Sequence, residues 1–336
     1  MQKPFISIYG IYKNEENKIN KFLNSVKLAD EIVLCDTGST DKTNEIVKDF
    51  MEQNTNVNLK IFHIFVSPWR FDDARNTALS LVSPNADICI SLDIDEYLCD
   101  DWKNILIQNY DDKITRYYHH FKTFWQDGRV SEHLHERIHS RYGYTWKLPV
   151  HEFLEYNGIE NTKQLNNFYI YQESETKSTR SDYFELLKQS IKEKSDHWKS
   201  YSFLANEYVS RKLFSDALSS IDVALSLKNS DKGFLYKQKY FIYKKIKQFD
   251  KAMINLDMSI SYMPDRRDIY IEKVQFLKEL GRFEEAYFLI CNIEKNTNKI
   301  IDYNFNPLAW GQEFQNLKKS LYDLVYKKLE GWGIFG

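Results

Sequence analysis

The chain has 336 residues, which is long enough for two domains of ordinary size. Hydrophobic residues make up 43% and charged residues 28%, as in a soluble globular protein. The low counts of 11 Gly and 6 Pro argue against fibrous repeats and against a turn-rich all-β fold. No apolar run reaches the roughly 20 residues of a transmembrane helix. Because the four cysteines form no CxxC pair and no signal-peptide pattern precedes them, we expect a cytoplasmic protein.

The two halves of the chain differ in charge and in texture. Residues 1–172 carry 19 basic and 25 acidic groups, for a net charge of −6, whereas residues 173–336 carry 27 and 23, for +4. A polar stretch at 172–180 lies between them. We therefore expect a first domain over residues 1–172, a linker with a connecting helix over 173–197, and a second domain over 198–336.

The first half alternates short apolar strands with helical patterns. Strands are predicted at residues 5–9, 31–35, 59–65 and 87–92, and helices at 15–26, 41–53 and 72–81. This alternation is typical of an α/β domain with a parallel sheet. Such sheets bind ligands at the carboxyl ends of their strands, so the polar residues after each strand are the candidates for chemistry. Beyond residue 112, two longer strands at 114–125 and 129–139 are predicted as an antiparallel pair.

The fourth predicted strand ends in a cluster of acidic residues. Asp93 and Asp95 stand one residue apart directly after this strand, and Glu96 follows. Two carboxylates at a strand end present oxygen ligands to a hard cation such as Mn²⁺ or Mg²⁺, which can bridge a diphosphate. The alternative is a solvated acidic loop, since such a pair of aspartates is common by chance.

The second predicted strand also ends in a carboxylate. Asp36 is placed to accept a hydrogen bond from the imide of a nucleobase, and Gly38 permits a tight turn after it. Ser39 and Asp41 are typical of a helix start, which is the structural alternative for this segment. Both functions are compatible with the same loop.

The second half contains a repeat. Ala217, Ala252 and Ala286 follow one another at spacings of 35 and 34 residues, and each comes three residues after a Phe. Small residues at this spacing are typical of tetratricopeptide helix pairs, in which the helices touch closely. The second half is therefore predicted as an all-α helical repeat domain. Such arrays bind macromolecules or serve as a surface for homodimerisation.

Four ordered motifs carry a resemblance to a known family. They are Ile-Tyr-Lys-Asn-Glu-Glu at 11–16, Asp-Thr-Gly-Ser-Thr-Asp at 36–41, Trp-Arg-Phe-Asp-Asp-Ala-Arg-Asn at 69–76 and Asp-Ile-Asp-Glu at 93–96. Residues 4–155 resemble the family-2 glycosyltransferases of GT-A fold, which is Rossmann-like with a mostly parallel sheet. With the repeats, the chain is similar to a subgroup that includes peptide S-glycosyltransferases and enzymes of surface-glycan synthesis.

The resemblance implies roles for individual residues. Tyr12 and Glu15 are expected at the base and ribose of a nucleotide sugar, and Asp36 at the base. Asp93 is expected to contact the ribose or the metal ion, and Asp95 to ligate the metal ion. A metal ion would offset the charge that grows on the departing nucleoside diphosphate.

Arg75 is expected to reach the phosphates or the sugar of the donor. Its positive charge would stabilise the same leaving group. The structural alternative is a salt bridge from Arg75 to Asp72 or Asp73.

A later segment, Val150-His151-Glu152, resembles the motif that closes the active site in this family. The resemblance implies that His151 is the third metal ligand or a pyrophosphate contact. The general base, a carboxylate that deprotonates the acceptor, is not decided by the sequence. Glu152, Asp127 and Glu96 are the candidates.

Six of the eight histidines lie between residues 119 and 151. His133, His135 and His139 have spacings that occur in zinc sites. On a strand these three side chains would share a face without converging on one ion. We therefore expect a structural role for them and not a zinc site.

The sequence leaves the function of two segments of the second half undecided. Residues 228–251 hold eight Lys and two Asp among aromatic residues. This pattern occurs in polyanion-binding surfaces and, more often, on the solvated face of a helix. The segment 314–335 is amphipathic, and we expect it to cap the repeats, with attachment to a membrane surface as the alternative.

These observations predict a metal-dependent inverting glycosyltransferase with Mn²⁺ or Mg²⁺ as cofactor. The donor would be a nucleotide-diphosphate sugar, with UDP as the expected nucleotide. We expect a macromolecular acceptor, and a peptide, protein or glycan is favoured over modified DNA. The alternative from another class is an inactive nucleotide-sugar-binding scaffold with a protein-binding repeat domain.

Overall fold

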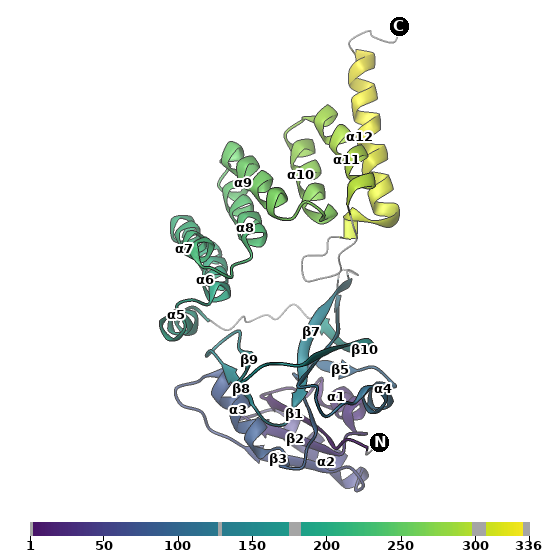
Figure 1. The fold of residues 1–336 in the computed structure, drawn as a ribbon, viewed down its shortest axis with the longest axis vertical. Coiled ribbons are helices and arrows are strands. Elements are labelled where there is room, and N and C mark those ends of the chain that lie inside the picture. Colours follow the sequence, from purple (N-terminus) through teal and green to yellow (C-terminus); the bar gives the residue numbers. More distant parts are fainter. Residues whose placement is uncertain (1–2, 127–129, 175–182, 298–306, 332–336) are drawn as a thin grey trace. The chain divides into compact units, whose positions relative to one another are not determined.

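The structure is a computed structural model that describes residues 3–126, 130–174, 183–297 and 307–331. It divides the chain into two compact units, Met1–Asp182 and Tyr183–Gly336 (Figure 1). The first unit continues past residue 172 because its last strand, β10, runs over Thr162–Ser174. Helix α5 (Phe184–Glu193), in the stretch expected to connect the domains, belongs to the second unit.

The first unit is built on a mixed sheet of eight strands in the order β3-β2-β1-β4-β7-β6-β10-β5. Besides β10, the strands are β1 (Ile6–Tyr12), β2 (Glu31–Asp36), β3 (Leu59–His63), β4 (Ile88–Ser91), β5 (Glu96–Leu98), β6 (Arg116–Trp125) and β7 (Val130–Ser140). The first four strands are parallel, which confirms the predicted α/β fold. The predicted antiparallel pairing of β6 with β7 is also confirmed.

Different elements cover the two faces of this sheet (Figure 1). One core includes buried side chains of helices α1 (Ile19–Val26), α2 (Thr43–Gln53) and α4 (Trp102–Asn109). The other includes side chains of helix α3 (Phe71–Leu81) and of a two-stranded sheet, β8 (Tyr144–Lys147) and β9 (Phe153–Tyr156). Apolar side chains recur on one face of each helix, as at Ile19, Phe22, Leu23 and Val26 of α1.

Two helices begin later than the sequence pattern indicates, because the residues before them bond across to a neighbouring loop. The amide of Glu15 donates to Thr43 Oγ1 at 2.8 Å, and the amide of Glu16 donates to Asp41 Oδ2 at 3.2 Å. Asp41 also accepts from the amide of Thr43 at 3.0 Å, which marks the start of α2. These bonds tie the loops after β1 and β2 together at one edge of the sheet.

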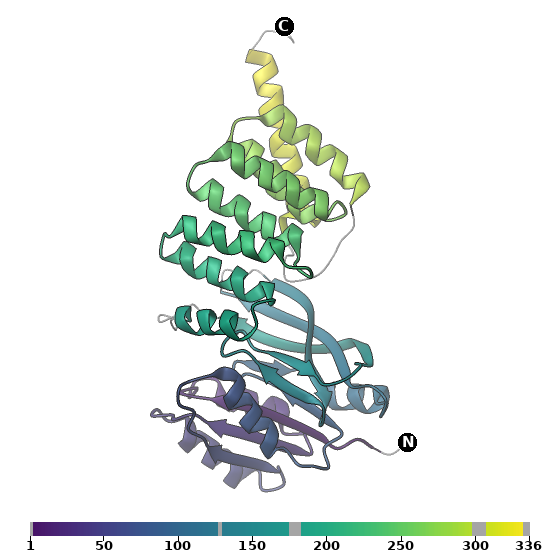
Figure 2. The same cartoon turned by 60° about the vertical axis from the view of Figure 1, so that its left-hand side comes forward.

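The second unit contains three antiparallel helix pairs (Figure 2). They are α6 (Trp198–Ser210) with α7 (Phe214–Ser226), α8 (Lys232–Lys245) with α9 (Phe249–Tyr262), and α10 (Arg267–Glu279) with α11 (Phe283–Asn296). Ala217, Ala252 and Ala286 are fully buried, as expected where paired helices approach closely. The predicted tetratricopeptide-like architecture is confirmed.

The last described helix, α12 (Gly311–Gly331), follows a short 3₁₀ turn η1 (Pro307–Ala309). Its side chains Phe314 and Leu321 are buried in a core shared with α10 and α11, so this helix packs onto the last repeat as expected. Within the described ranges, no helix has both the length and the apolar composition of a membrane span. The expected amphipathic pattern at Trp332 and Phe335 lies outside the described residues.

Candidate active site

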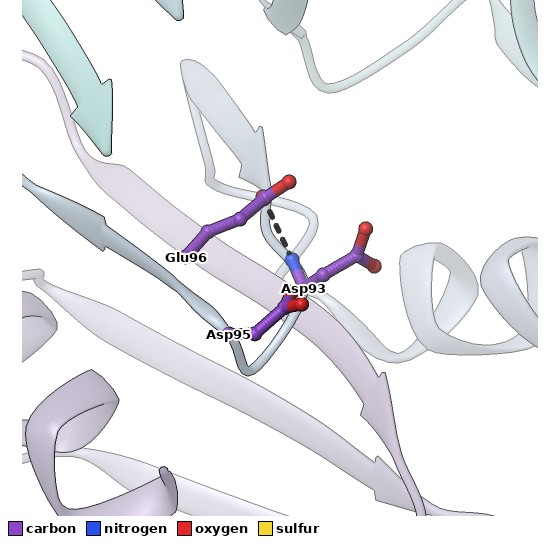
Figure 3. A group of neighbouring side chains, drawn as sticks. All are labelled: Asp93, Asp95 and Glu96. Carbon is purple, nitrogen blue, oxygen red and sulfur yellow. Dashed lines mark hydrogen bonds between the residues drawn. The ribbon is translucent and has the colours of Figure 1, made fainter. Parts of the chain in front are cut away.

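Three carboxylates gather where β4 ends and β5 begins. Potential ligand atoms of Asp93, Asp95 and Glu96 all lie within 4.8 Å of one another (Figure 3). The amide of Asp93 donates to Glu96 Oε2 at 2.9 Å, and Gln172 Nε2 of β10 donates to Asp95 Oδ2 at 3.2 Å. The loop is therefore held by its own third carboxylate and by the strand next to β5.

Arg75 of α3 connects this cluster to the segment before β9. Its Nη2 donates to Asp93 Oδ1 at 2.6 Å, and its Nε donates to Glu152 Oε1 at 2.6 Å. The alternative of a local salt bridge is wrong, because Asp72 pairs with Arg70 at 2.7 Å. The amide of Phe71 also donates to Pro149 O at 3.0 Å, which fixes the segment that carries Glu152 against the start of α3.

Arg137 of β7 is a member of the site that the sequence reasoning did not single out for a role. Its Nη1 lies 2.9 Å from Asp93 Oδ2 and 3.2 Å from Glu96 Oε2. A signal was present, because an arginine inside a strand that packs in a core needs an acidic partner. The partner itself depends on the order of the strands, which no local pattern gives.

The electrostatics of the cluster follow from burial and from these two arginines. Burial opposes the charge on Asp93, but Arg75 and Arg137 outweigh it and hold the pKa of Asp93 well below its usual range. Burial raises the pKa of Glu96 to about 8, although Arg137 opposes this shift. With Asp95 and Glu152 included, the carboxylates outnumber the guanidinium groups by two.

This donor set fits a divalent cation. Mg²⁺ and Mn²⁺ prefer carboxylate oxygens, and the carboxyl groups of the site outnumber its guanidinium groups, so it offers oxygen ligands and net negative charge to such an ion. Asp95 is partly exposed and accepts its hydrogen bond from the neutral amide of Gln172. His151, the expected third ligand, does not belong to the cluster, whose third member is Glu96. The ligand role of His151 stays a prediction.

Asp36 lies at the carboxyl end of β2, where a nucleobase was expected, but its carboxylate is heavily engaged. Oδ1 accepts from the amides of Gly38 and Ser39 and from Ser39 Oγ, at 3.1, 2.8 and 2.7 Å. Oδ2 contacts Asn44 Nδ2 at 2.8 Å and His63 Nδ1 at 3.1 Å. These bonds keep the pKa of Asp36 below its ordinary value despite its burial.

The two other residues expected at the nucleotide lie beside Asp36. Tyr12 is 3% exposed, its ring belongs to the core, and its hydroxyl donates to Asn44 Oδ1 at 2.7 Å. Glu15 is partly exposed in the loop after β1. The structure thus places Tyr12, Glu15 and Asp36 at one edge of the sheet. Tyr12 is buried there and contacts Asn44, which in turn donates to Asp36.

The candidates for the general base differ in accessibility. The Glu152 side chain is 11% exposed, and the bond to Arg75 engages its Oε1. Glu96 is 1% exposed, and its Oε2 accepts from both Arg137 and the amide of Asp93. Asp127 lies outside the described residues.

Two of the five histidines between residues 119 and 139 are buried within the sheet. His139 is fully buried, its Nδ1 donates to Ser140 O at 2.8 Å, and its Nε2 accepts from Tyr9 Oη at 2.9 Å. His119 is fully buried and stacks on His135 with ring centroids 5.9 Å apart. In the part of the chain that the structure describes, these histidines form no group suited to hold a metal ion, so a zinc site there is not supported.

The lysine-rich segment 228–251 overlaps helix α8, and two of its lysines form ion pairs with neighbouring helices. Lys239 Nζ lies 2.6 Å from Asp222 Oδ1 of α7, and Lys244 Nζ lies 2.7 Å from Glu279 Oε2 of α10. These pairs neutralise part of the charge that a polyanion would need.

Comparisons with known proteins bear on the first unit. Residues 7–173, about half of the chain, match the model of Glycosyl transferase family 2. No curated protein matches the sequence. One similar solved structure is S. aureus TarS, with 15% identity and a TM-score of 0.42 over 74% of this chain and 54% of that one.

Two other similar structures match smaller parts of the chain. A MamA protein has 18% identity and a TM-score of 0.29 over 44% of this chain and 79% of that one. A thermophilic TPR protein of Thermus thermophilus, TTC0263, has 17% identity and a TM-score of 0.32 over 43% and 71%. The family match covers nearly the whole sheet, from the second residue of β1 to the residue before the end of β10, and includes every residue of the carboxylate cluster. The chain is thus a glycosyltransferase whose first unit, of GT-A fold, belongs to glycosyl transferase family 2.

Proposed function

We propose that this glycosyltransferase is metal-dependent and inverting, and that it uses a nucleotide-diphosphate sugar, with UDP as the expected nucleotide. The observation that supports this most is the meeting of three carboxylates with the buried Arg75 at the carboxyl end of β4. Parallel sheets bind their ligands at this edge, and both a cation and an arginine favour a diphosphate there.

Each residue of the site then has a role. Asp95, Asp93 and Glu96 would hold Mn²⁺ or Mg²⁺, which when bound offsets negative charge on the departing nucleoside diphosphate. Arg75 donates to Asp93 and is proposed to stabilise the diphosphate beside the metal site. His151, one residue from Glu152, is proposed as a contact of the pyrophosphate.

We assign the general base to Glu152. Its Oε1 is fixed by Arg75, and its side chain is more exposed than that of Glu96. A carboxylate oriented in this way accepts the proton of the acceptor while the acceptor attacks the anomeric carbon from the side opposite the diphosphate. One displacement of this kind inverts the configuration at that carbon.

The nucleotide is expected at Asp36. Two side chains contact Asp36 Oδ2, and His63, which is 73% exposed, is the more distant, at 3.1 Å against 2.8 Å for Asn44. A base imide would therefore take the place of His63 on Oδ2. Glu15, in the loop after β1, is proposed to contact the ribose.

For the acceptor, the repeats favour a macromolecule, because stacked helix pairs form an extended binding surface. The ion pairs of Lys239 and Lys244 make a peptide, protein or glycan a better candidate than DNA. Dimerisation through the repeats and a cytoplasmic location stay predictions.

Hydrolysis of the donor tests the proposal without knowledge of the acceptor. The full chain is incubated with Mn²⁺ and each common nucleotide sugar, and the released nucleoside diphosphate is measured. We expect slow release that EDTA abolishes and Mn²⁺ restores. Absence of release and of thermal stabilisation with every donor would instead favour an inactive scaffold.

A further inference from the structure

One guanidinium nitrogen of Arg137 contacts two of the three clustered carboxylates. Nη1 lies 2.9 Å from Asp93 Oδ2 and 3.2 Å from Glu96 Oε2. We propose that Arg137 is an internal counterion that competes with the divalent cation for Asp93 and Glu96, and that it thereby couples metal binding to the diphosphate of the donor. This proposal rests on the metal dependence proposed above.

The competition follows from the position of the charge. The Arg137 side chain is 17% exposed and Glu96 is almost fully buried, so little water screens their interaction. Both oxygens of Asp93 are engaged by arginines, Oδ1 by Arg75 and Oδ2 by Arg137. A second cation that approaches the same oxygens meets the repulsion of these fixed charges, which is strong at short range in a buried site.

A purely structural role would not require a charge at this position. The third carboxylate, Asp95, is held by the neutral amide of Gln172 at 3.2 Å. The chain thus satisfies one carboxylate of the cluster with an uncharged donor, whereas Asp93 and Glu96 each contact the charged Arg137. This difference leaves Asp95 as the carboxylate that a metal ion can approach without displacing an arginine.

The same arrangement predicts cooperation with the donor. A diphosphate offers the guanidinium another anion, because arginine pairs with phosphate oxygens as readily as with carboxylates. Once Arg137 turns towards that anion, Asp93 and Glu96 are released to the cation. Metal and diphosphate then strengthen each other's binding, and by linkage the effect is reciprocal.

The test measures binding of Mn²⁺ alone to the full chain by calorimetry or by electron paramagnetic resonance. Arg137→Gln removes the charge, and we expect it to bind Mn²⁺ about tenfold more tightly than the wild type, since a neighbouring like charge is gone. Arg137→Lys keeps the charge and should stay within about threefold of the wild type. Lys122→Gln removes a charge that pairs with Glu132 and with none of the three clustered carboxylates, and should leave the affinity unchanged.

A second measurement uses the wild type and does not depend on the folding of a variant. UDP should tighten Mn²⁺ binding by about tenfold or more beyond the formation of the Mn–UDP complex in solution, and Arg137→Gln should show a smaller effect. Equal or weaker Mn²⁺ binding by folded Arg137→Gln overturns the inference, as does absence of coupling in the wild type. If no protein binds Mn²⁺ with or without UDP, the metal dependence fails as well.

Discussion

The Nη2 atom of Arg75 lies 2.6 Å from Oδ1 of Asp93, so helix α3 is fastened to the acidic end of β4. The same guanidinium reaches Glu152 through Nε, and Arg137 holds the other oxygen of Asp93. Acidic and basic groups therefore alternate along a chain of contacts through the site. The position of each group depends on its neighbours, which makes conservative substitutions informative.

Arg75→Lys should inactivate the enzyme although the charge is kept. An ammonium group is a compact point charge and cannot bridge Asp93 and Glu152 as the planar guanidinium does. We expect kcat for donor hydrolysis to fall by about 100-fold, as is typical when a fixed electrostatic group is lost. As a control, Arg141→Lys alters an arginine that contacts the carbonyl of Val82, and it should keep near wild-type activity. Equal effects of the two variants would contradict the assignment.

Glu152→Gln should abolish proton abstraction while it preserves an oxygen that can accept from Arg75. We expect kcat for transfer to an acceptor to fall by about 10²–10⁴-fold, with donor affinity changed little. Glu155→Gln, three residues later on β9, is the matched control. A rise in KM at unchanged kcat would show that Glu152 positions Arg75 and is not the base.

Asp95→Ala should remove the carboxylate of the cluster that no arginine holds. We expect loss of transfer and weaker binding of Mn²⁺ and of the donor, because a cation site has lost an accessible oxygen ligand. The variant should fold, since Asp95 is partly exposed and its hydrogen bond comes from the uncharged Gln172. Wild-type turnover after this substitution would refute the metal assignment.

The buried histidines should make the first unit sensitive to mild acid. Burial lowers the pKa of His119 and of His139 to about 3, whereas an unfolded chain titrates them near 6.5. Between these values the unfolded state binds more protons, so stability is full above about pH 6.5 and falls as the pH decreases towards 3. Each histidine contributes a loss of about 1.4 kcal/mol per pH unit within that window.

His119→Phe tests this expectation by urea unfolding at pH 7.5 and pH 5.5. Within the described residues Nε2 of His119 has no hydrogen-bond partner, and its ring packs on His135 and Phe168. Nδ1 of His119 lies 3.2 Å from His120 O, and this is the hydrogen bond that the variant gives up. The variant should therefore lose little stability at pH 7.5, and its stability should fall less between pH 7.5 and pH 5.5 than that of the wild type. If the free energy of unfolding of the variant fell between pH 7.5 and pH 5.5 as much as that of the wild type, a neutral buried His119 would be contradicted.

DNA binding by the lysine-rich segment 228–251 should be absent or weak. Two of its eight lysines, Lys239 and Lys244, are paired with acids of neighbouring helices, which lowers the positive charge available to phosphates. We expect no binding of a fluorescent DNA duplex in 50 mM salt by anisotropy. Binding with a slope of about −0.9 per phosphate contact against the logarithm of salt concentration would revive the DNA acceptor. Replacement of Lys237 and Lys245 by Gln would then have to flatten that slope.

Much of the fold could be predicted because its signals are local. The four parallel strands are short apolar runs that end in polar residues, and Ala217, Ala252 and Ala286 mark the helix pairs by their spacing. The gathering of Asp93 with Asp95 also follows from local sequence, since one residue separates them. The predicted starts of two helices were less accurate, because the loops around Glu15 and Asp41 form hydrogen bonds with each other at one edge of the sheet.

The remainder depends on long-range pairing. β10 lies between β6 and β5, and no local pattern indicates that Gln172 will face Asp95 across those strands. The partner of Arg137 is decided in the same way, by the antiparallel addition of β7 to β4. The engagement of Asp36 by His63 requires β3 beside β2. Sequence patterns therefore located the acidic cluster, but not the groups that hold it.

The segment that joins β4 to β5 limits how this enzyme can be altered. Residues 92–95 connect strands that are separated in the sheet by β7, β6 and β10. In a flat sheet with a spacing of about 4.8 Å this separation would be about 19 Å, which exceeds the roughly 18 Å that five fully extended residues span. Residues 94–95 also form a turn, in which the amide of Glu96 donates to Asp93 O at 3.0 Å, so the sheet has to curl to bring the two strands within reach. The length of the segment and the curl of the sheet are therefore matched. Loop grafts or single-residue insertions here would shift Asp93, Asp95 and Glu96 relative to one another even if all three were retained, so engineering of acceptor specificity should leave this length untouched.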